Sequence, residues 1–155
     1  MEIRKATVGD VSALRELYRA LEEDAVGYQP EHFVIGTRDD RFFLNIIESS
    51  GQDILVADDG GATVGFIHVM IIPQKRIPCL KPQTAVYIQD LCVREDMRSR
   101  GIGTKLIRAA KAYGRDNGAD FIRTQVFPRN EDGLRFYERN GFREMMKTIE
   151  CQSLE

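Results

Sequence analysis

The stretch from residue 90 to residue 110, DLCVREDMRSRGIGTKLIRAA, constrains the fold more than any other part of the chain. An apolar segment ends at Val93, a polar turn follows, and Gly101 and Gly103 then open a segment whose apolar residues recur every three or four positions. That spacing predicts an amphipathic helix. A strand that leads through a turn into a helix predicts a crossover to a parallel neighbouring strand.

The start of this expected helix is unusual, because glycine inside a helix costs roughly 1 kcal/mol relative to alanine. Only Ser99 or Asp96 could cap it, and neither is well placed if the helix begins at Gly101. Bare amides at the positive end of a helix dipole attract anions. The pattern therefore indicates a phosphate or pyrophosphate site, and the alternative is an ordinary turn that happens to use glycine. Basic side chains flank the two glycines at Arg98, Arg100, Lys105 and Arg108.

Two common phosphate-binding motifs do not match this stretch. The dinucleotide fingerprint Gly-x-Gly-x-x-Gly fails because Leu106 occupies the place of the third glycine. The P-loop fails because Gly103 is followed by Thr104 and Lys105, in the reverse of the required order. The pattern that remains is Arg-x-x-Gly-x-Gly.

Length, charge and cysteine content limit the class of protein. A chain of 155 residues predicts one domain over residues 1–155. The net charge of −2 argues against a nucleic-acid partner, and no stretch is long and apolar enough to predict a membrane span. Three scattered cysteines argue against disulfides and favour the cytoplasm. Two histidines and the absence of a Cys-x-x-Cys motif predict no metal site.

The periodicity of the remaining chain predicts an α/β fold with a mixed central sheet and helices on both faces. A hairpin turn is expected at Asp59-Gly60-Gly61. The expected elements, in order, are a strand at 3–6, a helix capped by Asp10, a loop at 27–38, a second helix, strands at 53–58, 63–72 and 84–93, the helix after Gly101, a strand at 120–127, a helix capped by Asn130, and a final strand at 142–149.

Two motifs and this order of elements resemble the GNAT superfamily of N-acetyltransferases. The strand DLCV followed by Arg98-x-x-Gly101-x-Gly103 resembles motif A of that family, and residues 130–142, NEDGLRFYERNGF, resemble motif B. The resemblance covers essentially the whole chain. It implies transfer of an acetyl group from acetyl-CoA to a primary amine of a small molecule or protein, and a possible homodimer.

The resemblance also implies which residues hold acetyl-CoA. The family's central strand carries a bulge and diverges from the next parallel strand, so that the pantetheine binds to strand amides in the gap and the pyrophosphate binds at the helix start. Asn130 would cap its helix or contact the pantetheine. The implied cofactor-binding residues are Leu91, Cys92, Val93, Arg98, Ser99, Arg100, Gly101, Ile102, Gly103, Thr104 and Asn130.

Catalytic roles follow partly from the resemblance. Tyr137 lies where motif B carries the general acid that protonates the leaving thiolate, and free tyrosine has a pKa near ~10. A packing tyrosine is the alternative. Gln89 stands where related enzymes carry a glutamate base, so the base stays open between Asp90, Tyr87, a water relay and an amine that arrives deprotonated.

Three further alternatives stay open. Cys92 could carry the acyl group in a ping-pong mechanism, or it could be a buried cysteine that packs the sheet. The chain could use another acyl-CoA, or it could bind acyl-CoA as a sensor without catalysis. The acceptor site is expected at residues 22–38 and 73–83, and the acidic side chains of the first segment could attract a cationic amine or simply mark an exposed helix end.

Overall fold

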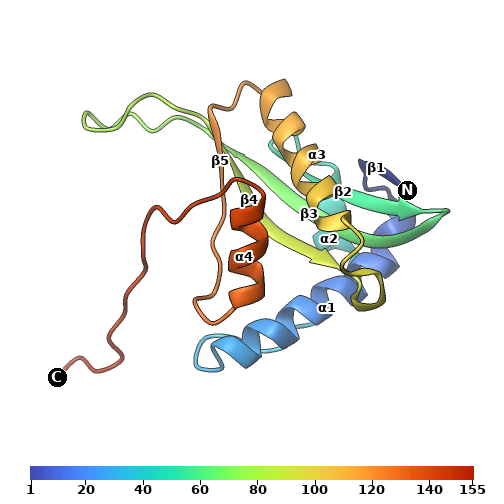
Figure 1. Ribbon diagram of the computed structural model, residues 1–155, viewed down its shortest axis with the longest axis horizontal. Coiled ribbons are helices and arrows are strands. Elements are labelled where there is room, and N and C mark those ends of the chain that lie inside the picture. The colour runs from blue at the N-terminus through green and yellow to red at the C-terminus, as the bar shows by residue number, and fades with distance from the viewer. The chain divides into compact units, whose positions relative to one another are not determined.

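A computed structural model describes residues 1–155 of the chain (Figure 1). The chain forms two compact units, Met1–Gln125 and Val126–Glu155. A single domain over residues 1–155 stays a prediction. The second unit contains the helix α4 (Glu131–Arg139). The first unit contains β1 (Glu2–Lys5), the short 3-10 helix η1 (Val8–Asp10), α1 (Val11–Tyr28), α2 (Asp40–Ile47), β2 (Gln52–Asp59), β3 (Ala62–Ile72), β4 (Ala85–Val93), the 3-10 helix η2 (Glu95–Met97), α3 (Ile102–Asp116) and β5 (Phe121–Arg123).

The sheet is mixed, as the sequence predicts. Its strands lie in the order β1-β2-β3-β4-β5, with antiparallel pairing from β1 to β4 and parallel pairing between β4 and β5. The helix α3 makes the crossover between the two parallel strands. The β2–β3 hairpin turn is confirmed, because Gly60 and Gly61 have φ angles of 63° and 94°, and the Gly61 N–H donates to Asp58 Oδ1 at 2.7 Å.

Helices cover both faces of the sheet. The buried side of α1 and α2 packs with Ile54, Val56 and Phe66, and the helices contribute the aromatic residues Tyr18 and Phe43 to this core. The alternate residues of the strands face α3, which Figure 1 shows lying across the sheet. There Leu106, Ile107 and Ala110 are fully buried.

The expected last strand is wrong. Residues 142–149 form no strand, the sheet ends at β5, and Met146 and Ile149 are each 90% exposed. The apolar pattern of this segment is compatible with a strand, but a strand exists only where a neighbour accepts and donates its main-chain hydrogen bonds. The strand expected at 120–127 forms only as Phe121–Arg123, because its partner β4 bulges beyond that point.

Asp10 does not cap α1 with its side chain. The helix has no side-chain cap, and the Asp10 carboxylate instead accepts hydrogen bonds from both terminal nitrogens of Arg4, at 2.8 and 3.0 Å. It also accepts from the Thr7 N–H at 2.7 Å and from the Thr63 hydroxyl at 2.6 Å. Asp10 is 3% exposed, so this network ties β1, η1 and β3 together in the interior.

No helix combines the length and apolar character that crossing a membrane requires.

Candidate active site

The loop between β4 and α3 brings backbone amides to one point. Ser99 and Gly101 have positive φ angles of 62° and 79°, and no side chain caps α3. The first hydrogen bond within the helix is donated by the Lys105 N–H to the Gly101 carbonyl at 3.1 Å. The amides of the first turn, at Ile102 and the two residues after it, therefore have no partner within the helix. Alternating left-handed residues before an uncapped helix make an anion-binding concavity.

Arg98 has a structural bond in this loop. Its Nε donates to the Val93 carbonyl at 3.0 Å, which joins the end of β4 to the residue just before the loop's left-handed turn. Ser99 and Arg100 are exposed beside it. Arg98 therefore fixes the turn, and its positive charge adds to that of Arg100 near the helix start.

One edge of β4 has no strand beside it over the half that leads into the loop. β5 pairs with β4 only at residues 85–87. The next main-chain group, the Ile88 carbonyl, accepts from the Thr124 hydroxyl at 3.0 Å. From Gln89 to Val93 the sheet is open toward β5, which is the divergence that the resemblance implies.

The pairing with β3 shows which β4 residues present their main chain to this open edge. The Arg94 N–H donates to the Val64 carbonyl at 2.8 Å, so these two form a hydrogen-bonded pair. Because such pairs alternate along an antiparallel ladder, Cys92 bonds to β3 and the main-chain groups of Leu91 and Val93 point away from it. The open edge therefore offers the amides of Leu91 and Val93.

A bulge in β4 changes the face of the strand. His68 pairs with Asp90, and the next residue of β3, Val69, pairs with Ile88, so Gln89 has no partner in β3. A bulge of one residue reverses the alternation of side chains. Ile88 therefore faces α3, and Asp90 lies on the α1 face, where its carboxylate is 3.9 Å from His68 Nδ1. Gln89 is exposed.

Cys92 belongs to the hydrophobic core. Its side chain is 5% exposed and packs in the cluster under α1 and α2. Burial raises the pKa of the Cys92 thiol to about 11, and the charge of Arg98 only partly offsets this. The thiol is therefore protonated near neutral pH and is a poor nucleophile, which favours the packing role over an acyl-enzyme.

An open cleft of about 830 Å³ lies between α1, the β2–β3 turn and the end of β4. Leu17, Cys92 and Val93 lie along it, and Arg98 reaches it from the loop. Its α1 side carries the carboxylates of Glu16, Glu23 and Asp24, and the side formed by the end of β4 and η2 carries Arg94, Glu95 and Arg98. The lining residues with charge are Arg4, Asp10, Glu16, Glu23, Asp24, Arg94, Glu95 and Arg98.

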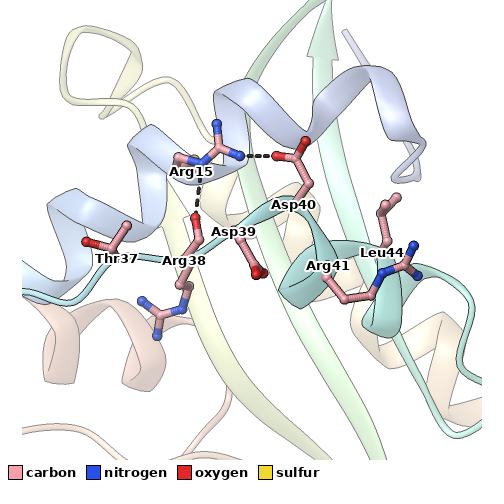
Figure 2. Close-up of a pocket in the computed structure, with 7 residues that line it drawn as sticks. All are labelled: Arg15, Thr37, Arg38, Asp39, Asp40, Arg41 and Leu44. Carbon is pink, nitrogen blue, oxygen red and sulfur yellow. Dashed lines mark hydrogen bonds and ion pairs between the residues drawn. The ribbon is translucent and has the colours of Figure 1, made fainter.

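Residues 22–38 carry less uncompensated negative charge than their sequence indicates. Glu22 forms an ion pair with Arg38 and accepts a hydrogen bond from the Gly36 N–H at 3.2 Å. Figure 2 shows a neighbouring surface pocket, where Arg15 bonds to the Arg38 carbonyl and to Asp40. The Glu22 charge is therefore already compensated within the protein.

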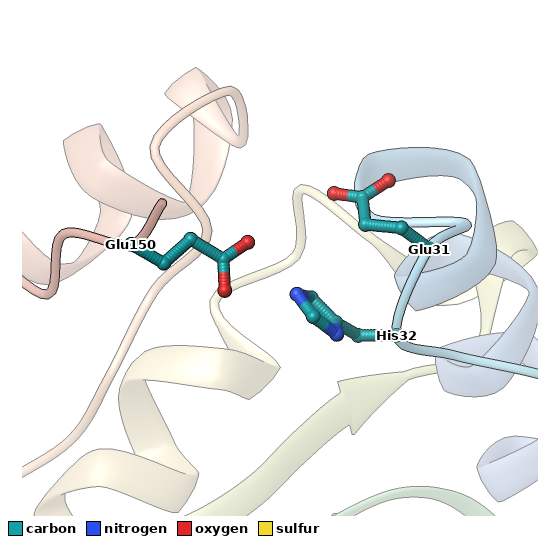
Figure 3. Close-up of side chains that lie close together, drawn as sticks. All are labelled: Glu31, His32 and Glu150. Atoms are coloured by element: carbon teal, nitrogen blue, oxygen red, sulfur yellow. The ribbon is translucent and has the colours of Figure 1, made fainter. Parts of the chain in front are cut away.

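Glu31 and His32 are exposed neighbours in the same segment (Figure 3). Glu150, the third side chain drawn there, belongs to the C-terminal unit.

Residues 130–142, which resemble motif B, lie in the second unit. Asn130 caps α4, because its Oδ1 accepts from the Gly133 N–H at 2.9 Å. The Tyr137 ring lies edge-on to the rings of Phe136 and Phe142, each with a centroid distance of 5.2 Å. The helix and its cap are confirmed, and the roles of Asn130 and Tyr137 toward acetyl-CoA stay predictions.

Asp90 belongs to a buried network whose other members the sequence motifs do not identify. His68 contacts Gln52, Tyr18 and Asp90. The one signal in the sequence is a histidine within the apolar strand GFIHVMII. Its partners come from three other elements, so only the tertiary structure identifies them.

The sequence matches the model of the acetyltransferase (GNAT) family over residues 13–142. An uncharacterized N-acetyltransferase of Bacillus subtilis, YhfO, is 29% identical over 148 residues, which cover 93% of this chain and 91% of YhfO.

Solved structures share the fold. A mutant of the BH1408 protein from Bacillus halodurans superimposes with a TM-score of 0.94 at 27% identity, covering 99% of this chain and 100% of that one. The aminoglycoside N-acetyltransferase AAC(6')-Iy in complex with CoA superimposes with a TM-score of 0.74 at 18% identity, covering 98% of both chains, and therefore shows likeness of fold alone. Because the family model spans most of the sequence, this protein belongs to the GNAT family of N-acetyltransferases.

Proposed function

We propose that the protein transfers the acetyl group of acetyl-CoA directly to a primary amine of a small molecule or protein. The observation that supports this most is the open edge of β4, which is followed, after the short helix η2 and a turn, by the uncapped start of α3. An extended chain that ends in a pyrophosphate needs both features in this order, because strand amides bind the chain and helix amides bind the anion.

In this proposal the residues of the loop and strand divide the work. The amides of Ile102, Gly103 and Thr104 hold the pyrophosphate, with the Ser99–Gly101 turn and the charges of Arg98 and Arg100 beside it. The amides of Leu91 and Val93 bind the donor at the open edge, and one of them stabilises the negative charge that develops on the thioester oxygen. The pairing with β3 directs the Cys92 N–H toward β3, so in this proposal Cys92 separates the two binding amides and does not itself bind the donor.

Proton transfer is assigned to two side chains. Asp90 is next to Leu91, and its side chain is 29% exposed, so a substrate ammonium can reach its carboxylate. We assign Asp90 as the base and Tyr137 as the acid that protonates the leaving thiolate. The raised pKa of Cys92 supports direct transfer over an acyl-cysteine.

A thiol-release assay over a panel of primary amines, with acetyl-CoA as donor, tests the activity. Gly101→Val tests the anion site, because Gly101 needs a left-handed backbone and an added side chain would stand at the helix start. We expect the Kd of acetyl-CoA to rise about tenfold or more, which corresponds to about 1.4 kcal/mol.

Gly60→Val is the matched control. Gly60 also has a positive φ angle, a Cβ there also meets nothing within 4 Å, and it lies in the β2–β3 turn. Equal loss of affinity in both variants, or no loss in Gly101→Val, would contradict the anion site. Thermal stabilisation by acetyl-CoA without thiol release from any amine would instead identify a non-catalytic acyl-CoA sensor.

A further inference from the structure

A buried polar network joins four elements on the α1 side of the sheet. His68 is 5% exposed, with its Nε2 at 2.7 Å from Gln52 Oε1 and its Nδ1 at 3.4 Å from the Tyr18 hydroxyl. Asp90 lies 3.9 Å from the same Nδ1. Tyr18 is 3% exposed, whereas the Asp90 side chain is 29% exposed. Asp90 is therefore the point where a buried imidazole meets the accessible surface beside the open edge of β4.

The partners of His68 suit both of its protonation states. In the neutral form, Nε2–H donates to Gln52 and Nδ1 accepts from the Tyr18 hydroxyl. In the charged form, Nδ1–H donates to the Tyr18 oxygen, and the hydroxyl hydrogen turns toward Asp90, whose negative charge acts on Tyr18. When His68 gains a proton, one rotation of the Tyr18 hydroxyl group therefore keeps the hydrogen bond between the two residues.

The other groups around His68 keep the Tyr18 hydroxyl protonated. Burial and then the negative charge of Asp90 raise the pKa of Tyr18 above its ordinary value, and the charge of Arg38 offsets this only partly. The Arg38 guanidinium lies 4.9 Å from the centre of the Tyr18 ring and is paired with Glu22. The charged or titratable groups that face His68 are thus Tyr18 from α1 and Asp90 from β4, with Arg38 behind the tyrosine.

We propose that Asp90, Tyr18 and His68 form a proton relay that removes the proton from the acceptor amine. This inference rests on the proposed N-acetyltransferase activity. The ammonium N–H bond breaks as its proton passes to the Asp90 carboxylate. The carboxyl proton then moves to the Tyr18 oxygen as the tyrosine's own proton moves to His68 Nδ1. Asp90 and Tyr18 regain their starting states, and His68 becomes an imidazolium that the Asp90 carboxylate and Gln52 stabilise.

The relay explains how a strand that carries Gln89 can still deprotonate an amine. An amide accepts no proton, and Gln89 is the residue of the bulge that has no partner in β3. The same bulge turns the next residue, Asp90, toward His68. Asp90 is the catalytic residue of this relay, and Tyr18, His68 and Gln52 are positioning residues that hold or pass the proton.

The test is the pH dependence of kcat/KM for an accepted amine between pH 5 and 9, measured with two amines of different basicity. The acid limb of the profile is the fall of kcat/KM at low pH. If it lies at the same pH with both amines, it reports a group of the enzyme rather than of the substrate. His68→Gln keeps an N–H donor toward Gln52 and removes the imidazole nitrogen that accepts the proton in the relay. We expect it to lower kcat/KM tenfold or more and to change the acid limb, with the KM of acetyl-CoA unchanged.

Gln52→Glu is the second variant, and we expect it to shift the pH profile rather than to abolish activity. A carboxylate at Nε2 favours the imidazolium, because an opposite charge stabilises the charged form. The acid limb should therefore move to higher pH, by about one unit. Tyr18→Phe keeps the ring, which stacks on Phe66 at 4.7 Å, and removes the hydroxyl link. We expect it to lower kcat/KM as His68→Gln does.

Asp116→Asn is the control, because Asp116 is an exposed ionisable residue at the C-terminal end of α3. The shape of its pH profile should be that of the wild type. Wild-type profiles in folded His68→Gln and Gln52→Glu, with activity lost in Asp90→Asn, would overturn the relay and leave the N-acetyltransferase proposal intact. If His68→Gln does not fold, the position of the acid limb in Gln52→Glu decides whether the relay exists: a shift supports it, and a wild-type position overturns it. Absence of thiol release from the wild type with every amine would overturn both proposals.

Discussion

Tyr137 and Cys92 are the side chains whose chemistry differs most between direct transfer and an acyl-enzyme route. Burial under α1 and α2 raises the pKa of the Cys92 thiol to about 11, so a thiolate nucleophile is scarce near neutral pH. Direct transfer then needs an acid for the leaving thiolate of the donor. Tyr137 is held between Phe136 and Phe142 through its ring, which leaves its hydroxyl as the chemical difference from phenylalanine.

Tyr137→Phe should therefore keep the ring contacts and lose the acid. We expect kcat to fall about 100-fold, the lower end of what general acid catalysis contributes, with little change in the KM of acetyl-CoA. Steady-state kinetics with an accepted amine measure this. Tyr113→Phe is the control, because Tyr113 lies on α3, where burial and Asp53 raise its pKa to about 12. An unchanged kcat in Tyr137→Phe would remove Tyr137 as the acid.

At the scale of elements, the bulge in β4 has two effects. It separates β4 from β5 after residue 87, which opens the edge at Leu91 and Val93. It also turns Asp90 to the α1 face, opposite His68. Both effects depend on one residue that has no partner in β3, Gln89.

Deletion of Gln89 should remove the bulge without changing the pairs on either side of it. Ile88 would remain opposite Val69 and Asp90 opposite His68, so a regular ladder can form and the chain should fold. A straighter β4 would follow β5 further and close the open edge. We expect acetyl-CoA to bind at least about tenfold more weakly in isothermal titration calorimetry.

Gln89→Ala is the matched control for the deletion, since it shortens the exposed side chain and keeps the extra residue in the strand. It should bind acetyl-CoA as the wild type does. Retained affinity in a folded deletion variant would show that the open edge does not depend on the bulge.

The Asp10 network links segments that are distant in the chain. Asp10 joins Arg4 of β1 to Thr63 of β3, and Arg4 also contacts Asp58 of β2 at 3.0 Å. Burial raises the pKa of Asp10, but hydrogen bonds from Arg4, Thr63 and Thr7 outweigh it, and the pKa lies well below its ordinary value.

Asp10→Asn should lower the free energy of unfolding at pH 7 by about 2 kcal/mol, because it removes the buried carboxylate that accepts hydrogen bonds from Arg4, Thr7 and Thr63. The folded-state pKa of Asp10 is lower than the unfolded one, so its ionised form stabilises the protein above about pH 4, and this contribution is lost as the pH falls further. Urea denaturation at several pH values should thus show the difference between wild type and variant shrinking below about pH 4.

Asp96→Asn is the control for this effect. Hydrogen bonds from Arg94 also lower the pKa of Asp96, but this pair is exposed, so its loss should change stability far less. A wild-type stability for Asp10→Asn at pH 7 would contradict the structural role of the network.

The sequence determined much of the fold, because local signals set most of its elements. Periodicity placed the strands and helices of residues 1–125, and Gly60 and Gly61 fixed the hairpin turn through their positive φ angles. Local signals failed at residues 142–149, since a segment becomes a strand only beside a neighbour that bonds to it.

For the site, the sequence predicted the glycine turn and the uncapped start of α3, because the two glycines act through the backbone next to them, and anion binding there stays a prediction. The sequence did not reveal that the amides of Leu91 and Val93 face the open edge or that the Cys92 thiol is buried, because these depend on the register with β3. Nor did it reveal that Tyr18, Gln52, His68 and Asp90 meet. These residues lie on four elements, and pairing and burial, which are long-range properties, bring them within hydrogen-bonding reach.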